Sequence, residues 1–271
     1  MKTMRILVVM IACVLVAGLA QADVWGVRVV PGAGNQLINI NPFTGVIAQT
    51  WVAPNSAPQN TNMGLAGWRD ELFYTNADAE NGKIYVIDPM TGATTRTFAL
   101  DGGWAVDGLG YWSESAVDYL YTSGCSVDDV HRYLAADGAD PQFYWSDVMN
   151  PMTIAGDNGG RVFTVGMNLQ GQGRFGIWEM NPQVDLPATW FASSPSDSIL
   201  GGAFDGIYLY LSDASGNLYT IDGSGNVVNT LGLDGYSLYA LGSTEGTGPE
   251  PGTIVLFGLG LAGLASIRRK R

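Results

Sequence analysis

Residues able to carry out catalysis are scarce in this chain, which has one histidine and two cysteines among its 271 residues. A Ser-His-Asp triad could be built only around His131, and no Gly-x-Ser-x-Gly elbow precedes a helical pattern. Cys125 lies in the same segment, but a free cysteine is more often structural than reactive. So few His and Cys residues cannot form a zinc cluster, and the sequence has no Walker-type phosphate loop. We therefore expect no enzymatic activity.

Carboxylates are the one abundant functional group. Asp107, Asp157 and Asp205 each lie near a strand of small residues, and three converging carboxylates would suit calcium. Because aspartate is also a common turn former, we favour turn chemistry for all three. The segment Asp213-Ala214-Ser215-Gly216-Asn217 is reminiscent of a calcium loop but lacks the later bidentate glutamate of an EF-hand. The sequence thus predicts no metal or cofactor, with calcium at these weak candidates as the alternative.

The negative charge of the chain is concentrated in its central part. Between residues 23 and 248 there are 7 basic and 24 acidic residues, a net charge of 7 − 24 = −17. Such an acidic body repels nucleic acid and anionic lipid headgroups, so we expect no nucleic-acid partner. Once Cys13 has left with an N-terminal signal, Cys125 is the only cysteine. The body then has no internal disulfide and must be stabilised by packing alone.

The N-terminus has the three parts of a secretory signal. Lys2 and Arg5 precede an apolar run at residues 6–19, and the small-residue pattern Ala20-Gln21-Ala22 follows. We expect the export machinery to cleave the chain after Ala22. The alternative is a retained membrane helix, but the run has about 14 residues whereas a span needs ~20.

The C-terminus combines a proline motif, an apolar stretch and a cationic end. Pro249-Glu250-Pro251 precedes the apolar residues 253–267, and the chain ends in Arg268-Arg269-Lys270-Arg271. The apolar stretch would rise about 23 Å as a helix, which is short of a ~30 Å hydrocarbon core. The terminal cations would stay in the cytoplasm by the positive-inside rule, so they would stop export at this point.

This tail resembles the PEP-CTERM sorting signal, which has a Pro-Glu-Pro motif, a short Gly- and Leu-rich membrane segment and a basic terminus. The resemblance implies export in a Gram-negative bacterium, tethering at the inner membrane in transit, and processing by an exosortase. The cell surface or the extracellular space is the destination that it implies. The alternative is a single-span tail anchor that is never cut. Because the resemblance covers only the end of the chain, it implies sorting and no activity.

An internal repeat organises the residues between the two ends. Residues 37–47 recur at 84–94 and 218–228, with weaker copies at 175–182 and 131–138. Each copy has a strand ending in Asp or Asn, a turn with Pro or Gly, and a second strand, which together predict a β-hairpin. The Asp or Asn side chain can accept hydrogen bonds from nearby amides, and Gly supplies the positive φ of the turn.

Upstream of each hairpin, a small-residue strand with glycine precedes an aromatic-rich strand. Clear cases are residues 64–67 with 72–75 and 108–110 with 119–121; residues 154–156 with 162–164 and 202–204 with 207–210 follow the same pattern. Four strands per repeat are typical of a propeller blade, and the small strand would line the central channel. The first unit, residues 24–52, lacks this inner strand, and we expect residues 236–241 to supply it.

The predicted fold is therefore all-β, a single β-propeller of five four-stranded blades closed by a C-terminal strand. The repeats resemble those of YVTN and PQQ-type propellers, which implies an architecture and no ligand. We expect a signal helix at residues 1–22, the propeller at 23–244, a linker with the Pro-Glu-Pro motif at 245–252, and a short membrane helix with the basic tail at 253–271.

Two functions are compatible with these features. The first is an exported, surface-associated, non-enzymatic propeller that binds a matrix component, either a polysaccharide or a partner protein, through one face of the ring. The second is a calcium-dependent secreted enzyme of the lactonase or lyase type. Eight tryptophans could stack on sugar rings, although we expect most aromatic residues to wedge between blades: Trp25, Trp51, Trp68, Trp104, Trp112, Trp145, Trp178 and Trp190.

Overall fold

The computed structural model describes residues 23–55, 62–76, 82–101, 106, 108–114, 116–123, 129–145, 148–149, 154–156, 161–168, 175–180 and 188–244. All regular structure in these ranges is β-strand, from β1 to β21. These strands belong to one compact unit, Asp23–Glu245. The expected signal helix and membrane helix lie outside the described residues.

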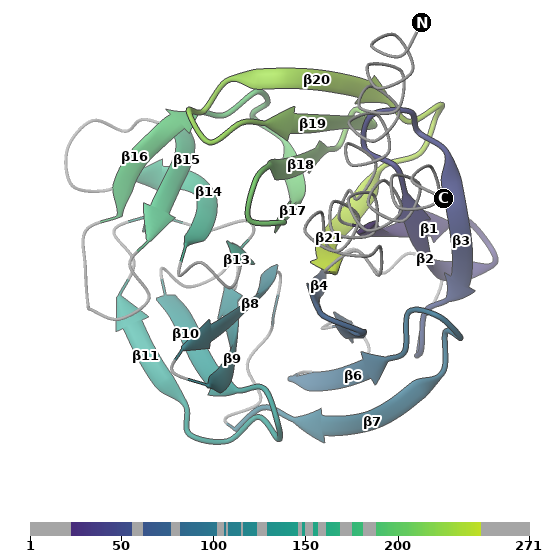
Figure 1. The fold of residues 1–271 in the computed structure, drawn as a ribbon, viewed down its shortest axis with the longest axis vertical. Helices are drawn as coiled ribbons and strands as arrows, with labels where there is room; N and C mark the ends of the chain where they lie inside the picture. The colour runs from purple at the N-terminus through teal and green to yellow at the C-terminus, as the bar shows by residue number, and fades with distance from the viewer. Residues whose placement is uncertain are drawn as a thin grey trace, which may run out of the picture. The chain divides into compact units, whose positions relative to one another are not determined.

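The strands form five antiparallel sheets, which are the blades of a propeller (Figure 1). From the inner to the outer strand, the first blade is β21 (Leu238–Thr244), β1 (Asp23–Val30), β2 (Gly34–Ile40) and β3 (Ile47–Val52), and the second is β4 (Met63–Trp68), β5 (Glu71–Asn76), β6 (Lys83–Ile87) and β7 (Thr94–Ala99). The third is β8 (Gly108–Glu114), β9 (Val117–Ser123), β10 (Asp129–Leu134) and β11 (Gln142–Trp145), and the fifth is β17 (Ile199–Phe204), β18 (Leu209–Asp213), β19 (Asn217–Ile221) and β20 (Val227–Gly232).

The fourth blade differs because its inner position is shared by two short strands. β12 (Val148–Met149) and β13 (Ile154–Gly156) both pair with β14 (Val162–Asn168), which continues to β15 (Phe175–Met180) and β16 (Thr189–Ser193). Pro151 lies between the two pieces, and proline has no amide hydrogen for a sheet ladder. The predicted inner strand at 154–156 is confirmed, and β12 is an addition to the expected pattern.

The ring closes as predicted, by pairing the last strand of the propeller with the first. β21 is antiparallel to β1, with Asp23 opposite Thr244 and Val27 opposite Ala240. The first blade therefore takes its inner strand from the C-terminal end of the body and its other strands from the N-terminal end. The prediction of an all-β propeller with five blades is confirmed.

The repeated hairpins have the predicted turn chemistry. Asn41 Oδ1 accepts hydrogen bonds from the amides of Phe43 and Thr44, both at 3.0 Å. Asp88 Oδ1 accepts the amide of Met90 at 2.7 Å in the equivalent turn. The turn ends on Gly92, whose φ is +70°, a conformation that favours glycine. These acidic and amide side chains are therefore occupied within their own turns.

The same turns also join neighbouring blades. A Cβ atom on Gly92 would lie 2.6 Å from the ring of Trp51 in the preceding blade, and Trp51 Nε1 donates to the carbonyl oxygen of Pro89 at 3.1 Å. At the closure of the ring, Asn229 Nδ2 of the fifth blade donates to the carbonyl oxygen of Pro42 of the first blade at 2.9 Å. Each of these hairpin turns thus packs on the outer strand of the blade before it.

Aromatic side chains fill the space between blades. Trp68 of β4 stacks on Tyr111 of β8 with ring centroids 4.5 Å apart, and Phe163 of β14 contacts Phe204 of β17 edge-on at 4.9 Å. No described tryptophan side chain is exposed: Trp25, Trp68, Trp112 and Trp178 are buried, and Trp51 and Trp190 are half-buried. The side chains of Trp104 and Trp145 lie outside the described set. Most tryptophans therefore contribute to packing, as expected.

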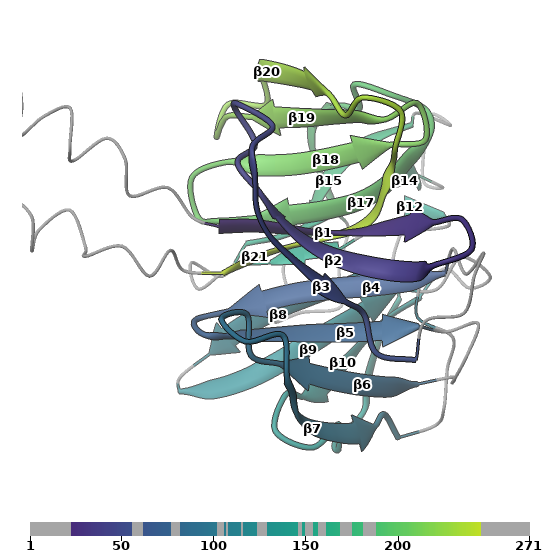
Figure 2. The ribbon, with the colours of Figure 1, turned by 90° about the vertical axis from the view of Figure 1, so that its right-hand side faces the viewer.

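The antiparallel order gives the ring two distinct faces. Among the described turns, those between the first and second strands of a blade and those between the third and fourth strands lie on one face, which we call the hairpin face. The described turns between second and third strands and the described connections between blades lie on the opposite face, which we call the loop face. In the side view of Figure 2, β1 begins and β21 ends on the side where β17 turns into β18, so both ends of the propeller meet at the hairpin face.

Candidate functional site

The central channel of the propeller is nearly closed by its inner strands. A Cβ atom on Gly67 would collide with the carbonyl oxygen of Ser243, and one on Gly242 would lie 2.9 Å from the backbone of Ala66. The space left between the described parts of these strands has a cavity volume of about 10 Å³, roughly the requirement of one water molecule. The predicted small-residue lining is confirmed, and it leaves no room for a small-molecule ligand there.

Only one of the three weak calcium candidates can be placed. Asp205 lies between β17 and β18, where its Oδ1 accepts the amides of Ile207 and Tyr208 at 2.8 and 2.7 Å. Its Oδ2 accepts the Tyr210 hydroxyl at 2.7 Å. Asp205 is thus a turn residue with both oxygens engaged, whereas Asp107 and Asp157 lie outside the described residues. Among the residues that are described, no group of three or more His, Cys, Asp or Glu could hold a metal ion.

The calcium-like segment after β18 is also a turn. Asp213 is buried, and its Oδ1 accepts the amides of Ser215 and Asn217 at 3.0 and 2.8 Å. Its Oδ2 accepts the side-chain amide of Asn217 at 3.1 Å and the Tyr219 hydroxyl at 2.9 Å. Burial by itself would raise the pKa of Asp213, but hydrogen bonds from Asn217, Tyr219 and Ser196 hold it below its usual value. This carboxylate is an ionised cap for the β18–β19 turn.

The only histidine lies in the sheet of the third blade. His131 of β10 is buried, and its Nδ1 lies 3.2 Å from the hydroxyl oxygen of Tyr133. Cys125 lies outside the described residues. The histidine is therefore part of the packed interior, and its position gives no support to a triad or a Cys-His pair.

Positive side chains in the described ranges lie over aromatic rings. Arg161 donates to both oxygens of Glu179 at 2.9 and 3.0 Å, and its guanidinium lies 4.7 Å from the ring centre of Phe163. A positively charged group also lies over an aromatic ring in five further pairs: Arg28 over Tyr236, Arg69 over Trp68, Lys83 over Tyr85, Arg96 over Phe73, and Arg132 over Tyr119. Each basic side chain in the described ranges therefore lies near an aromatic ring.

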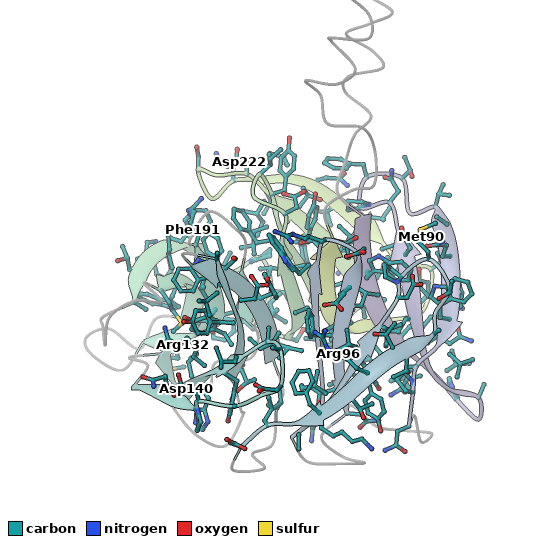
Figure 3. The ribbon with its side chains drawn as sticks, turned by 60° about the horizontal axis from the view of Figure 1, so that its bottom comes forward. Met90, Arg96, Arg132, Asp140, Phe191 and Asp222 are labelled. Atoms are coloured by element: carbon teal, nitrogen blue, oxygen red, sulfur yellow. The ribbon has the colours of Figure 1, made fainter. Side chains whose placement is uncertain are left out.

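Exposed apolar side chains are concentrated on the hairpin face. Of ten large apolar residues that are exposed in the described part of the chain, eight lie in its turns or directly after them. We call them the apolar turn set: Phe43, Val46, Ile47, Met90, Val117, Ile207, Val227 and Val228. Ile207, Val46 and Met90 are the most exposed of the set, at 66%, 62% and 60%, and Met90 lies at the outside of the ring in Figure 3. The other two, Val52 and Met167, lie at the loop-face ends of their strands.

This set was missed in the sequence, although the repeat contains a signal for it. The residue after proline in the turn is Phe43 in one copy and Met90 in another, where a polar residue would suit solvent better. Val46, directly after Gly45, and Val227, two residues after Gly225, are also apolar. Sequence alone cannot show that these positions share one face, because that depends on the direction of every strand in the ring.

The predicted sorting residues lie outside the described ranges, so their arrangement is not described. They are Ala20 and Ala22 of the signal, Pro249, Glu250 and Pro251 of the motif, and Arg268, Arg269, Lys270 and Arg271 at the end. Comparison with protein families matches residues 249–270 to the PEP-CTERM protein-sorting motif. The chain carries a PEP-CTERM sorting motif. Such a motif implies export, membrane-associated sorting and exosortase-type processing. The described residues include no helix with the length and hydropathy of a membrane span.

Solved structures with propeller folds resemble the chain at low identity. A catalytically inactive virginiamycin B lyase from Staphylococcus aureus with quinupristin is 15% identical, over 79% of this chain and 71% of that one, with a TM-score of 0.42. Hydrazine synthase from Kuenenia stuttgartiensis is 12% identical over 76% and 65% of the two chains, with a TM-score of 0.41. No curated protein sequence matches the chain. At these values the likeness concerns the fold only.

Proposed function

We propose that the protein is an exported, surface-associated propeller of a Gram-negative bacterium that binds a matrix component and catalyses no reaction. The closed centre of the ring is the observation that carries this proposal. The described parts of the inner strands leave a cavity with room for about one water molecule, which supports a binding site on the outer surfaces of the ring. Extended surfaces of this kind suit a macromolecule, such as a polysaccharide or a partner protein, better than a small metabolite.

The burial of the described tryptophans argues against sugar binding by stacking on exposed indole rings. A sugar platform built from exposed indoles is not supported by the described residues, since all six placed tryptophans are buried or half-buried. The loop face between the fourth and fifth blades instead carries an exposed carboxylate, that of Asp197. Asp197 is flanked by Ser194, Ser196 and Ser198, which are half-buried and form hydrogen bonds with one another. Hydroxyl and carboxylate groups of this type could bind sugar hydroxyls or peptide amides.

Binding of the exported protein to a glycan array and to extracellular matrix extract tests this proposal. We compare two exposed loop-face variants, Asp197→Arg and Ser215→Arg, with two exposed hairpin-face variants, Met90→Arg and Ile207→Arg. We expect binding to be lost in the loop-face pair and kept in the hairpin-face pair. Binding by none of the proteins, or equal binding by all of them, contradicts a ligand site on the loop face.

The enzymatic alternative is tested with the same protein. Calcium titration followed by a panel of lactone and glycan substrates would detect a calcium-dependent lactonase or lyase. We expect no turnover with or without calcium. Calcium-dependent turnover would overturn the non-enzymatic proposal. Loss of that turnover on Asp205→Asn, with Asp213→Asn as the matched control, would place the site at the candidate carboxylates.

A further inference from the structure

The apolar turn set lies on the face of the propeller where the last described strand, β21, ends. Thr244, the last described residue, pairs with Asp23 at the hairpin-face end of β21. Nine residue steps separate Thr244 from residue 253, where the apolar stretch begins. An extended chain spans at most about 3.3–3.6 Å per residue, so the linker between Thr244 and residue 253 reaches no further than about 30 Å. A membrane that holds the tail is therefore within reach of the hairpin face.

The backbone amides at the tips of these turns are hydrogen-bonded within the protein, so the tips can be desolvated without leaving those amides unpaired. The amides of Phe43 and Thr44 are bonded to Asn41, and the amide of Met90 is bonded to Asp88. Ile207 has the same arrangement, because its amide donates to Asp205 at 2.8 Å. An apolar tip can thus enter an interfacial layer while its own backbone donor stays satisfied.

The negative charge of these turns restricts which lipid headgroups can contact them. The side chains of Asp88, Asp205 and Asp222 cap turns on this face and are half-buried, so they place negative charge beside the apolar tips. Hydrogen bonds from Thr91 and Met90 lower the pKa of Asp88, and those from Asn226 lower the pKa of Asp222. The Asp88 and Asp222 carboxylates are therefore ionised at neutral pH, and they repel anionic headgroups while tolerating zwitterionic ones.

We propose that the hairpin face rests on the membrane while the tail is held there, with the apolar turn set inserted shallowly among zwitterionic headgroups. This inference rests on the export and membrane-associated sorting of the chain. It deepens the proposed function because the loop face, where we propose that the matrix component binds, would point away from the membrane. Phe43 and Ile207 would share one contact region, because Phe43 packs edge-on against Tyr208, the neighbour of Ile207, with ring centroids 5.8 Å apart.

Labelling of single cysteines tests this orientation on the full chain. Cys13→Ser and Cys125→Ser give a background in which Met90→Cys or Ile207→Cys reports on the hairpin face. Val52→Cys and Met167→Cys report on the loop-face ends of the strands as matched controls. Each protein is labelled with an environment-sensitive fluorophore and reconstituted in phosphatidylcholine vesicles, and the vesicle-bound fraction is isolated by flotation. Quenching by aqueous iodide and by lipid-borne nitroxide is then measured.

The hairpin-face labels should lose most of their iodide quenching on vesicles and gain nitroxide quenching, and the control labels should change in neither respect. Equal iodide access at all four positions overturns the proposal, as does protection of the control labels alone. Protection that increases when phosphatidylglycerol is added also overturns it, because contact would then depend on positive charge. The vesicles contain no polysaccharide or matrix protein, so failure here is distinguishable from failure of matrix binding.

Discussion

The indole of Trp51 in one blade lies against Gly92 in the hairpin turn of the next, with Trp51 Nε1 bonded to the carbonyl oxygen of Pro89 at 3.1 Å. A Cβ atom at position 92 would be only 2.6 Å from the ring, so glycine is required by this contact as well as by its φ of +70°. The repeated turn therefore closes a hairpin and packs two blades together at the same time.

Gly92→Ala should lower the free energy of unfolding by about 2–5 kcal/mol, the sum of backbone strain at positive φ and overpacking against Trp51. Gly32 also has a positive φ, +79°, but nothing lies within 4 Å of its added Cβ, so Gly32→Ala should cost only about 1–2 kcal/mol. Gly223→Ala has neither problem and should be nearly neutral. Urea denaturation of the three variants measures this order, and equal losses at positions 32 and 92 would contradict the role of the contact.

Asp213→Asn should lower the free energy of unfolding at pH 7 by about 1–3 kcal/mol, because buried hydrogen bonds to an ionised acceptor are lost. The folded-state pKa of Asp213 lies below its ordinary value of 3.8, so its contribution is present above that pH and is lost as the pH falls through the lower folded value. The gap between the native protein and the variant should therefore narrow below about pH 4. Urea midpoints between pH 7 and pH 2 check this, with the exposed Asp197→Asn as control. A gap that stays constant down to pH 2 would show that the carboxylate charge is not involved.

The mature protein should begin at Asp23, because cleavage after Ala22 leaves β1 complete and its pairing with Thr244 intact. Ala22→Leu should block the cut, since the signal requires small residues in this pattern. Gln21→Leu changes the residue between the two alanines and should be processed normally. N-terminal sequencing of the exported protein checks all three. Recovery of native protein that still carries residues 1–22 would refute the cleavage.

Replacing Pro249, Glu250 and Pro251 with alanine should leave the chain in the membrane fraction at its unprocessed size. Proline lacks the amide hydrogen of a helix and biases the residue before it toward extended geometry, so we expect alanine to let this segment become helical. Glu245→Ala lies in the same linker but outside the motif, so it serves as the control. Immunoblots of membrane and extracellular fractions from a host with an exosortase measure the outcome. Unchanged release of the triple variant would show that the motif is not needed for processing.

The local sequence determined the blades of this protein. Residues 84–94 specify a hairpin by themselves, since Asp88 caps its own turn and Gly92 adopts the required φ within a few residues of chain. The sorting motif at the C-terminus could also be predicted from the sequence, because a sorting signal is recognised as a short linear segment. The closing strand at 236–241 could be inferred as well, because the first blade lacked an inner strand.

The tertiary structure alone decided which residues share a surface. Phe43 and Tyr208 are separated by most of the chain, and they meet on the hairpin face only because ring closure brings the first and fifth blades together. The same closure leaves a cavity of about 10 Å³ between the described parts of the inner strands, since the approach of Gly67 to Ser243 depends on how tightly five sheets pack around one axis. Local sequence determines the turns and strands because their hydrogen bonds are local. Faces and cavities arise from contacts between segments that are distant in the chain.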